Sequence, residues 1–467
     1  MSEPVRSESS VTLPAPAVRS LRACLKGAVI ERDKYGWDEA TQAFNLTVIQ
    51  KPALVAFPAD KEDVIAIVEF ARANGMRVAA QRTGHGAGPL LALDDVILVR
   101  TDNLKSVEID AGRRTARVGA GATWAQVIPP ASDLGLATLH GTSDGVGVAG
   151  YSLGGGIGWY ARKLGLAANS ITAVELVTAD GRLRRVDADR EADLFWAVRG
   201  GGGNFGLVTA LELELYAIPD IYAGALFFPR ERSSDVLKTW LEWTDTVPDE
   251  VTSVARILQF PPLAEVPEQL RGERFAIVEA VYIGDEASGS DLLKPLRELG
   301  PAMDTFGMAP PAGVADLHMN PPQPLPYVAE GQVLGPLDEE AIDRFVEAAG
   351  PASGSPLAFA EIRHAGGALS QPQPHNGALS TLDADYLAFA VAMAQSEEMR
   401  RAGRSQLDTI AEALRPYDNG RAYPNFAERR VDPARFYTPA VYRRLRELKR
   451  TFDPRDLFRA NHPIAPA

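Results

Sequence analysis

Three glycine-rich segments hold the residues best able to bind a phosphate-bearing ligand. The first, Arg82–Gly88, has glycine at every second position from Gly84 and contains His85. The second runs from Gly141 to Gly156, and the third from Gly200 to Gly206. Backbone without Cβ atoms can approach a diphosphate closely and point several N–H groups at it. Together the three segments predict a nucleotide cofactor.

A single glycine cluster in isolation is better explained as a tight turn or a β-bulge, and it is the occurrence of three clusters within about 120 residues that favours a cofactor site. None of them matches the dinucleotide fingerprint G-x-G-x-x-G in a βαβ unit with an acidic residue about 20 positions on, so a Rossmann-type NAD site is disfavoured. A lone histidine such as His85 is more often structural than catalytic. The pattern by itself therefore leaves the role of His85 open.

The elements before the first segment position it. Asp60 and Asp63 open a helix whose apolar residues follow at helical spacing, and Asn74-Gly75 ends it. Residues 77–81 then read as a short buried strand that runs directly into the loop of His85. A helix, a strand and exposed backbone in this order are typical of a phosphate-binding site.

Antiparallel strands follow. Between residues 96 and 118 two β-rich runs meet at Asp110-Ala111-Gly112, and a hairpin over 171–186 turns at Asp180-Gly181. Residues 207–216 alternate leucine with glutamate, which predicts a strand with one buried face. A short helix around Leu194 precedes the third glycine cluster. The first half is therefore predicted to be α+β.

Composition changes near residue 220, where longer helices and Pro-rich connections such as 321–326 begin, and this predicts a second domain. The chain has 467 residues with 46% hydrophobic and 23% charged residues, the balance of a globular protein with a large core. From about Pro416 the chain again mixes short motifs with one long helix. We expect this last part to return to the first domain.

The charge balance argues against a nucleic-acid partner. The net charge is -13, whereas binding to phosphate backbones needs a basic face. One basic run is predicted to lie on the outer face of a C-terminal amphipathic helix: Arg443, Arg444, Arg446, Lys449 and Arg450.

The expected compartment is the cytoplasm. Cys24 is the single cysteine, so neither an internal disulfide nor a multi-cysteine metal site is possible, and we expect no metal. Residues 1–16 lack the pattern of a secretory signal, and no segment has the roughly 18 apolar residues of a membrane span. The sequence gives no indication of the oligomeric state.

Taken together, these motifs resemble the vanillyl-alcohol oxidase superfamily with its PCMH-type FAD domain, and in particular the bacterial berberine-bridge-enzyme-like (BBE-like) branch of FAD-linked oxidases. The resemblance covers nearly the whole chain. The matching segments are 51–71, 82–85, 146–158, 193–202, 423–426 and 452–464. Because six segments match in the same order along the chain, they are specific evidence for this family, whereas one glycine cluster alone would be weak evidence.

The resemblance implies a two-part FAD-binding domain over 48–218, an α+β substrate domain with a helix-covered antiparallel sheet over 219–415, and a C-terminal segment, 416–467, that closes over the flavin. His85 falls where relatives bond a histidine to the flavin 8α-methyl group. The residues that the resemblance assigns to FAD are Arg82, Thr83, Gly84, His85, Gly86, Ala87, Gly141, Thr142, Ser143, Asp144, Gly147, Gly150, Tyr151, Gly154, Gly155, Val208, Asn425 and Asn461.

A second covalent bond is excluded at the position where some relatives carry a cysteine. That position is Ser143 here, and Cys24 lies in a different segment. The resemblance therefore implies a singly linked FAD, and we expect a less constrained ring and a more open substrate pocket.

The resemblance also implies hydride transfer from a substrate carbon to flavin N5 while a protein base removes a proton. Tyr423 matches the tyrosine that serves as base in several relatives, and Asn425 would lie on the same side of an extended segment. A phenol has a pKa near 10, so Tyr423 needs a neighbouring charge or dipole that lowers its pKa. The alternative interpretation is that Tyr423 is a core tyrosine whose hydroxyl is hydrogen-bonded within the protein.

The segment 361–368 resembles the strand and glycine pair that place substrate-domain residues above the flavin. Alternation would point Glu361 and Arg363 one way, and Ile362 and His364 the other. His364 and Tyr386 are further pocket candidates, with structural roles as the alternative. His318 and His375 lie in Pro-containing loops and receive no role.

Three functional classes fit these features. The first is an FAD-dependent oxidase or dehydrogenase that acts on the CH–OH group of a sugar, alcohol or secondary metabolite and is reoxidised by oxygen. The others are a flavin-dependent tailoring monooxygenase and a flavin-binding protein with little turnover. His85 and the Tyr423-x-Asn425 pattern favour the enzyme, whose partner is a small-molecule substrate.

Overall fold

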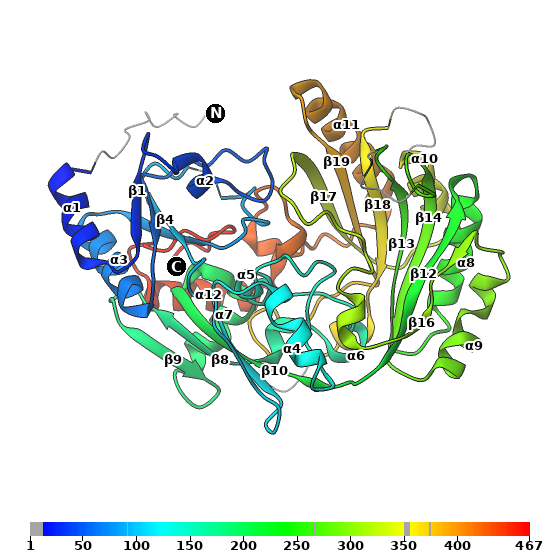
Figure 1. Cartoon of the computed structure of the whole chain (residues 1–467), viewed down its shortest axis with the longest axis horizontal. Helices are drawn as coiled ribbons and strands as arrows, with labels where there is room; N and C mark the ends of the chain where they lie inside the picture. Colours follow the sequence, from blue (N-terminus) through cyan, green and yellow to red (C-terminus); the bar gives the residue numbers. More distant parts are fainter. Residues whose placement is uncertain (1–12, 91, 263, 265–267, 350–354, 373–374) are drawn as a thin grey trace.

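The computed structural model describes residues 13–90, 92–262, 264, 268–349, 355–372 and 375–467. Most of residues 1–16, on which the prediction about a secretory signal was based, therefore lies outside the described residues. The chain forms two halves, each with its own sheets, and helices cover the outer face of the second (Figure 1). Within the described residues, no helix has the length and apolarity needed to cross a membrane.

The first half holds a four-stranded sheet and a five-stranded sheet. The four-stranded sheet has the order β1-β2-β4-β3 and the five-stranded sheet the order β5-β6-β10-β8-β9. The strands are β1 Ala28–Glu31, β2 Leu54–Phe57, β3 Arg77–Gln81, β4 Val96–Arg100, β5 Val107–Asp110, β6 Thr115–Gly119, β8 Ile171–Val177, β9 Leu183–Asp187 and β10 Leu207–Glu214, and the separate pair is β7 Leu136–Ala137 with β11 Tyr216–Ala217. The helices are α1 Ala15–Cys24, α2 Trp37–Thr41, α3 Lys61–Ala73, α4 Ile128–Ser132, α5 Val148–Leu153, α6 Ala161–Leu164 and α7 Ala192–Gly201.

The local predictions around the first glycine segment are confirmed. The Asp60 side chain caps α3 by accepting a hydrogen bond from the Asp63 amide, and the helix ends before Asn74. β2 and β3 both pair in parallel with β4, and α3 connects them. β3 therefore delivers the chain to the loop of His85 at the carboxyl end of a buried strand, the end where such sheets bind ligands.

The predicted antiparallel hairpins are confirmed at their turns, but residues 96–100 do not belong to them: they form β4, which pairs in parallel with β2 and β3. β5 pairs with β6, and β8 pairs with β9 across the turn that contains Gly181, whose φ is +81°. β10 lies between β6 and β8, with Leu211 and Leu213 buried and Glu214 exposed. The five-stranded sheet is thus antiparallel throughout, and the first half is α+β.

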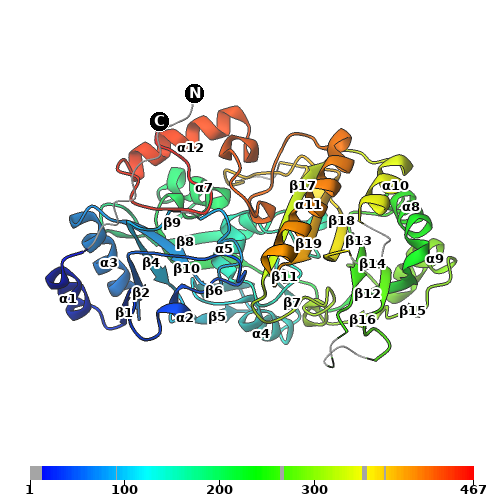
Figure 2. The ribbon, with the colours of Figure 1, turned by 90° about the horizontal axis from the view of Figure 1, so that it is seen from above.

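The second half is an antiparallel eight-stranded sheet, with β12 to β19 in the order β15-β12-β14-β13-β18-β19-β17 and β16 beside β12. Its strands are β12 Ile221–Pro229, β13 Val251–Gln259, β14 Arg274–Tyr282, β15 Met303–Asp304, β16 Gly307–Ala309, β17 Tyr327–Leu334, β18 Leu357–His364 and β19 Tyr386–Met393. Four helices pack on its outer face (Figures 1 and 2): α8 Ser233–Thr244, α9 Glu286–Arg297, α10 Glu339–Ala348 and α11 Glu397–Leu414.

The two faces of this sheet differ in polarity. Apolar residues such as Ala255, Val278 and Ile362 point into the core beneath the helices. Their sequence neighbours point the other way, and these include the charged Arg256, Glu279, Glu361 and Arg363. Because side chains alternate along a strand, the charged set lies on the face opposite the helices.

The C-terminal residues return to the first half. The last helix, α12 Pro439–Phe452, packs against α7 (Figure 2), and Phe458 forms a β-bridge with Val78. The domain boundaries at 218 and 415 stay predictions.

One prediction for α12 is wrong. Lys449 does not lie on the outer face with its basic neighbours but is fully buried, 2.6 Å from Asp453. Its ammonium also donates to the carbonyl oxygen of Asn204, so the free-energy cost of burying the charge is offset by an ion pair and hydrogen bonds. Asp453 in turn accepts the amides of Leu457 and Phe458. This cluster fixes the direction in which the chain leaves α12.

Candidate active site

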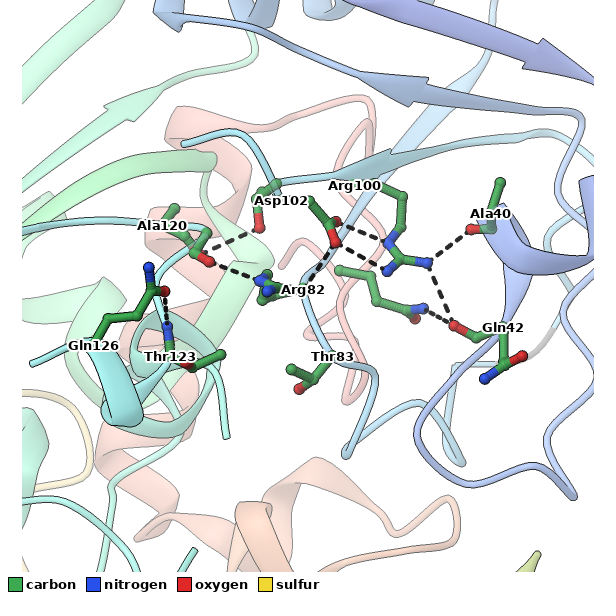
Figure 3. Close-up of polar contacts among 12 residues, drawn as sticks. Ala40, Gln42, Arg82, Thr83, Arg100, Asp102, Ala120, Thr123 and Gln126 are labelled. Atoms are coloured by element: carbon green, nitrogen blue, oxygen red, sulfur yellow. Dashed lines mark hydrogen bonds and ion pairs between the residues drawn. The ribbon is translucent and has the colours of Figure 1, made fainter. Parts of the chain in front are cut away.

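An arginine–aspartate cluster fixes the start of the His85 loop. Arg82 Nε donates to the carbonyl oxygen of Gly121 at 2.7 Å, and its Nη1 lies 2.9 Å from Asp102 (Figure 3). Arg100 contacts the same carboxylate at 3.2 Å and donates to the carbonyl oxygen of Ala40. The Arg82 side chain is therefore engaged within the protein, at the base of the predicted cofactor loop.

His85 is held as a neutral imidazole. Its ring stacks on Phe44 with centroids 3.8 Å apart and 18° between the planes, and Nδ1 lies 2.8 Å from Thr83 Oγ1. Burial lowers the pKa of His85 to about 4. A neutral ring keeps one nitrogen lone pair, which is what bond formation to an electrophilic carbon requires.

The second glycine segment packs directly on the C-terminal segment. A Cβ atom on Gly154 would lie 1.9 Å from Asn425 Oδ1, and Gly155, with φ of +119°, has the Tyr423 ring 3.0 Å from its Cβ position. Asn425 Nδ2 donates to the carbonyl oxygen of Tyr151 at 2.9 Å. Glycine is required here because the chain approaches closely, with backbone in the left-handed region.

The same segments meet around the His85 loop. Asn461 Nδ2 donates to the carbonyl oxygen of Gly86 at 2.5 Å, and a Cβ on Gly147 would lie 3.3 Å from the Arg82 side chain. Gly200 packs on Leu379, which also contacts Gly155, so the third cluster borders the second. Tertiary packing thus assembles all three glycine segments in one place.

The other residues assigned to a cofactor are spread over this region. Thr142, Ser143 and Asp144 are half-buried, and Asn320 Nδ2 donates to the Thr142 carbonyl oxygen at 2.7 Å. Burial and the charge of Asp316 raise the pKa of Asp144. Val208 lies in β10 with its side chain in the core.

The region has the properties that a flat, diphosphate-bearing cofactor requires. In the part of the chain that the structure describes, no atom lies within 4 Å of the Cβ position of exposed Gly150, whereas the Cβ positions of Gly154 and Gly155 lie close to other segments. Tyr151 Oη and Ser152 Oγ are buried and have no hydrogen-bond partner among the described residues. Open backbone beside unpaired polar groups fits a bound nucleotide.

Tyr423 is buried with its hydroxyl surrounded by groups that favour a negative oxygen. Burial raises its pKa well above the usual range, while the amides of Gly156 and Ile157, the side chain of Asn425 and the charge of Arg363 act in the opposite direction. Asn425 Nδ2 lies 3.3 Å from Tyr423 Oη. The structure supplies the neighbouring dipoles and charge that a tyrosine base needs, but the free protein holds Tyr423 as a neutral phenol.

Arg363 extends from β18 toward the same place. Its guanidinium lies 5.2 Å from the ring centroid of Phe426, which packs edge-on against Tyr423. Its Nη2 donates to Thr142 Oγ1 at 3.3 Å, and its Nε donates to Glu361 at 2.6 Å. The predicted pairing of Glu361 and Arg363 on one face is confirmed.

His364 and Tyr386, the other two catalytic candidates, lie on the helix-covered face of the sheet. They are paired across β18 and β19, and their rings stack 5.7 Å apart. Tyr386 Oη hydrogen-bonds Thr244 Oγ1 of α8 at 2.7 Å. The structure therefore does not bring either residue together with Tyr423, because alternation along β18 turns His364 away from Arg363.

His318 was given no role from the sequence, yet it is fully buried among the charged residues of the sheet. Nδ1 lies 2.5 Å from Glu279 and Nε2 lies 2.9 Å from Glu361. These partners come from β14 and β18, so no local spacing could reveal the contact.

Comparisons with known proteins show which proteins this chain is similar to. Residues 52–187 match the family model described as FAD binding domain, and residues 422–465 match the one described as berberine and berberine like. The (R)-6-hydroxynicotine oxidase of Paenarthrobacter nicotinovorans is 27% identical over 456 residues, 95% of this chain and 97% of that protein. An uncharacterised FAD-linked oxidoreductase of Bacillus subtilis (strain 168) is 26% identical over 95% of this chain and 97% of its own length.

A chitooligosaccharide oxidase structure superposes with a TM-score of 0.81 at 25% identity, covering 97% of this chain and 100% of that one. The fold and site thus define an FAD-dependent oxidoreductase. The chain carries an FAD-binding domain and a berberine-like C-terminal domain, and it is similar to BBE-like FAD-linked oxidases over nearly its whole length.

Proposed function

We propose that this protein oxidises a small organic substrate at a CH–OH or similar carbon, with FAD attached through His85 and Tyr423 as the base. The observation that carries the proposal is the environment of Tyr423 Oη. Asn425 Nδ2 lies 3.3 Å from it, and the amides of Gly156 and Ile157 together with the charge of Arg363 act to lower the pKa of the phenol. Such a set of donors stabilises an oxyanion. Bound FAD would accept the substrate hydride at N5.

The single covalent bond is supported by the site around His85. Its neutral imidazole and fixed ring provide a positioned nucleophile. A glucooligosaccharide oxidase with the same fold, TM-score 0.80, carries a 6-S-cysteinyl, 8α-N1-histidyl FAD. Ser143 cannot form the cysteinyl bond, so we propose histidyl attachment alone.

Substrate protons would leave through Tyr423. In the free protein burial keeps the phenol neutral, so the hydroxyl first acts as a hydrogen-bond donor to a substrate oxygen. To take the substrate proton, Tyr423 must first release its own proton to solvent; the charge of Arg363 and the donors around Oη would favour the resulting phenolate, which then accepts the substrate proton as the hydride leaves. Asn425, held by the Tyr151 carbonyl oxygen, positions Oη for this step.

The relatives define the range of substrates to be tested. They include oxidases named for hydroxynicotine, glucooligosaccharides and chitooligosaccharides. We propose oxygen as the electron acceptor and the cytoplasm as the compartment, the latter supported by the single cysteine.

The test is an absorbance spectrum of the purified protein, followed by acid precipitation. We expect yellow flavin to stay in the pellet for the wild type and to move to the supernatant for His85→Ala. Anaerobic bleaching of the bound flavin by sugars, alcohols and amines then identifies the substrate class, and peroxide formation on adding air identifies oxygen as the acceptor.

Flavin released from the wild type would contradict the covalent bond but keep the FAD site. Thr244→Val serves as a control, because it removes the hydrogen bond to Tyr386 on the helix-covered face of the sheet and should leave the flavin in the pellet. A colourless protein that takes up no FAD would contradict the proposed function.

A further inference from the structure

Three phenylalanine rings follow Tyr423 along the inner face of the eight-stranded sheet, the face opposite the helices. Phe426 packs edge-on against Tyr423, with ring centroids 5.2 Å apart. Phe389 of β19 lies 4.8 Å from Phe426, and Phe359 of β18 lies 6.3 Å from Phe389. The three phenylalanines are half-buried, so part of each ring is open, and we call them the aromatic wall. Apolar side chains gathered in one place beside a reactive group are typical of a ligand site.

The sheet is shaped to bring this wall together. Gly331 of β17 lies opposite Phe389 in the register of β17 and β19. A Cβ on Gly331 would lie 2.8 Å from Phe426 Cβ and 3.3 Å from the Phe389 ring. Glycine inside a strand weakens it and is typical of a place where another segment approaches closely. Gly331 therefore lets Phe426, which comes from the C-terminal segment, reach Phe389 and place the wall beside Tyr423.

The charged side chains of this face are paired with one another. Arg256 lies 2.6 Å from Glu279, and His318 Nδ1 lies 2.5 Å from the same carboxylate. These three side chains are no more than 2% exposed, and Phe359 packs edge-on against the His318 ring. A sugar has many hydroxyl groups that each need a hydrogen-bond partner once they leave water. Phenyl rings above charges that are already paired do not supply such partners.

Two segments beside the site are also free of charge. Residues 42–50 and 319–327 contain no Asp, Glu, Lys or Arg, in a chain in which 23% of the residues are charged. The two segments meet, because the Leu46 amide donates to the carbonyl oxygen of Leu325 at 3.0 Å. They carry three exposed apolar side chains: Leu46, Ile49 and Met319. An apolar ligand would therefore meet no charged group along these segments.

From these features we propose that the aromatic wall binds a planar aromatic ring of the substrate, so that the protein oxidises aromatic alcohols rather than sugars. The proposal rests on the proposed oxidase function and names its substrate class. Aromatic rings attract one another in offset-stacked or edge-on arrangements, beyond the effect of the area they bury. Because Phe426 contacts both Phe389 and Tyr423, a ring held by the wall places its attached C–OH carbon near the Tyr423 hydroxyl.

The experiment is anaerobic calorimetric titration of the flavin-loaded protein with benzamide and with cyclohexanecarboxamide. Both probes are neutral amides of similar size without a C–OH group, and they differ in the planar ring. We expect benzamide to bind about two- to tenfold more tightly, the usual contribution of an aromatic pair. Cellobiose, titrated in the same way, should bind at least tenfold more weakly than benzamide. Equal binding of the two amides, or tighter binding of cellobiose, would overturn the proposal.

Phe389→Leu and Phe359→Leu test the wall itself, because leucine keeps an apolar side chain but removes the ring. We expect the preference for benzamide to fall toward one in each variant, with binding of cyclohexanecarboxamide unchanged. The matched control is Phe306→Leu, since Phe306 is also half-buried but packs against Tyr222 at the edge of the sheet. Its preference should equal that of the wild type. A preference that survives both Phe389→Leu and Phe359→Leu contradicts the role of the wall.

The two proposals fail separately. Flavin bleaching reports on the oxidase function, whereas the ratio of the two amide affinities reports on the wall. If sugars bleach the flavin and benzamide does not bind, the aromatic class is refuted and the oxidase function stands. If benzamide shows the expected preference and no alcohol bleaches the flavin, the wall stands and the oxidase function is refuted. Should one wall variant not fold, the other variant and the wild type still decide the outcome.

Discussion

The imidazole of His85 stacks on the ring of Phe44, with centroids 3.8 Å apart and an angle of 18° between the planes. Phe44 comes from the segment before β2, and its backbone amide donates to the carbonyl oxygen of Thr83. The stack and the Thr83 contact hold the imidazole in one orientation, which a covalent bond to the cofactor requires.

Phe44→Ala should therefore slow covalent attachment more than it destabilises the fold. We expect a loss of about 1–2 kcal/mol in unfolding free energy for a half-buried ring, and a clearly lower fraction of flavin retained after acid precipitation. Ile49→Ala is the control, because Ile49 is 81% exposed in the same segment. Unchanged attachment in Phe44→Ala would show that the stack is only structural.

Tyr423 and Tyr386 form a matched pair for testing the base, because both are buried tyrosines with a hydrogen-bonded hydroxyl. Tyr423→Phe should slow anaerobic flavin reduction about 10²- to 10⁴-fold, the usual contribution of a general base. Tyr386→Phe should cost about 1 kcal/mol of stability through the lost bond to Thr244 and leave the rate unchanged. Stopped-flow absorbance measures both, and equal rates for the wild type and Tyr423→Phe would remove Tyr423 from the mechanism.

Gly154 and Gly150 should respond differently to alanine. A Cβ on Gly154 would overlap Asn425 Oδ1, so Gly154→Ala should displace the C-terminal segment and lower the melting temperature. A Cβ on Gly150 would have no atom of the described residues within 4 Å, so Gly150→Ala should fold normally. Reduced FAD content in a normally folded Gly150→Ala protein would place the cofactor against that glycine, and full FAD content would place it elsewhere.

Stability should fall as the pH drops from about 6.5 to about 4. Burial lowers the pKa of His140 in the folded protein to about 4, although its hydrogen bond to the Gly141 carbonyl oxygen acts in the opposite direction. In the unfolded chain the same imidazole is protonated already below about pH 6.5, so between these two pH values protonation favours the unfolded state. For this fully buried ring the decrease in the free energy of unfolding is at most about 3 kcal/mol. Melting temperatures between pH 8 and pH 4 test this.

His140→Asn should flatten that pH dependence while retaining a donor near the Gly141 carbonyl oxygen. Burial also lowers the pKa of His462, so part of the dependence of the melting temperature on pH should remain in this variant. A slope that is identical in the wild type and in His140→Asn would show that His140 does not contribute.

The buried Lys449 should anchor the C-terminal residues that reach the His85 loop. Lys449→Met leaves the Asp453 carboxylate without its cation, and we expect a loss of about 3–5 kcal/mol in urea unfolding. Arg450→Met changes an exposed neighbour and should have little effect. Comparable stability of the two variants would contradict the anchoring role.

Local patterns determined much of this fold. The capped helix α3, the strand β3 and the hairpin β8–β9 follow from spacing and turn residues that lie within about 15 positions of one another. Period-two alternation also set Glu361 and Arg363 on one face of β18. The ordered family motifs added the FAD-binding domain and its glycine segments.

Only the tertiary structure decided which charges meet. Arg363 meets Thr142 across 221 positions of sequence, and His318 meets carboxylates from two different strands. The basic neighbours of Lys449 predicted an exposed side chain. Burial of its ammonium group is favourable only because Asp453 and the Asn204 carbonyl oxygen, which folding brings close, pair with it. Sequence spacing sets the face on which a side chain lies, whereas the energy of a buried charge depends on partners that folding brings from elsewhere.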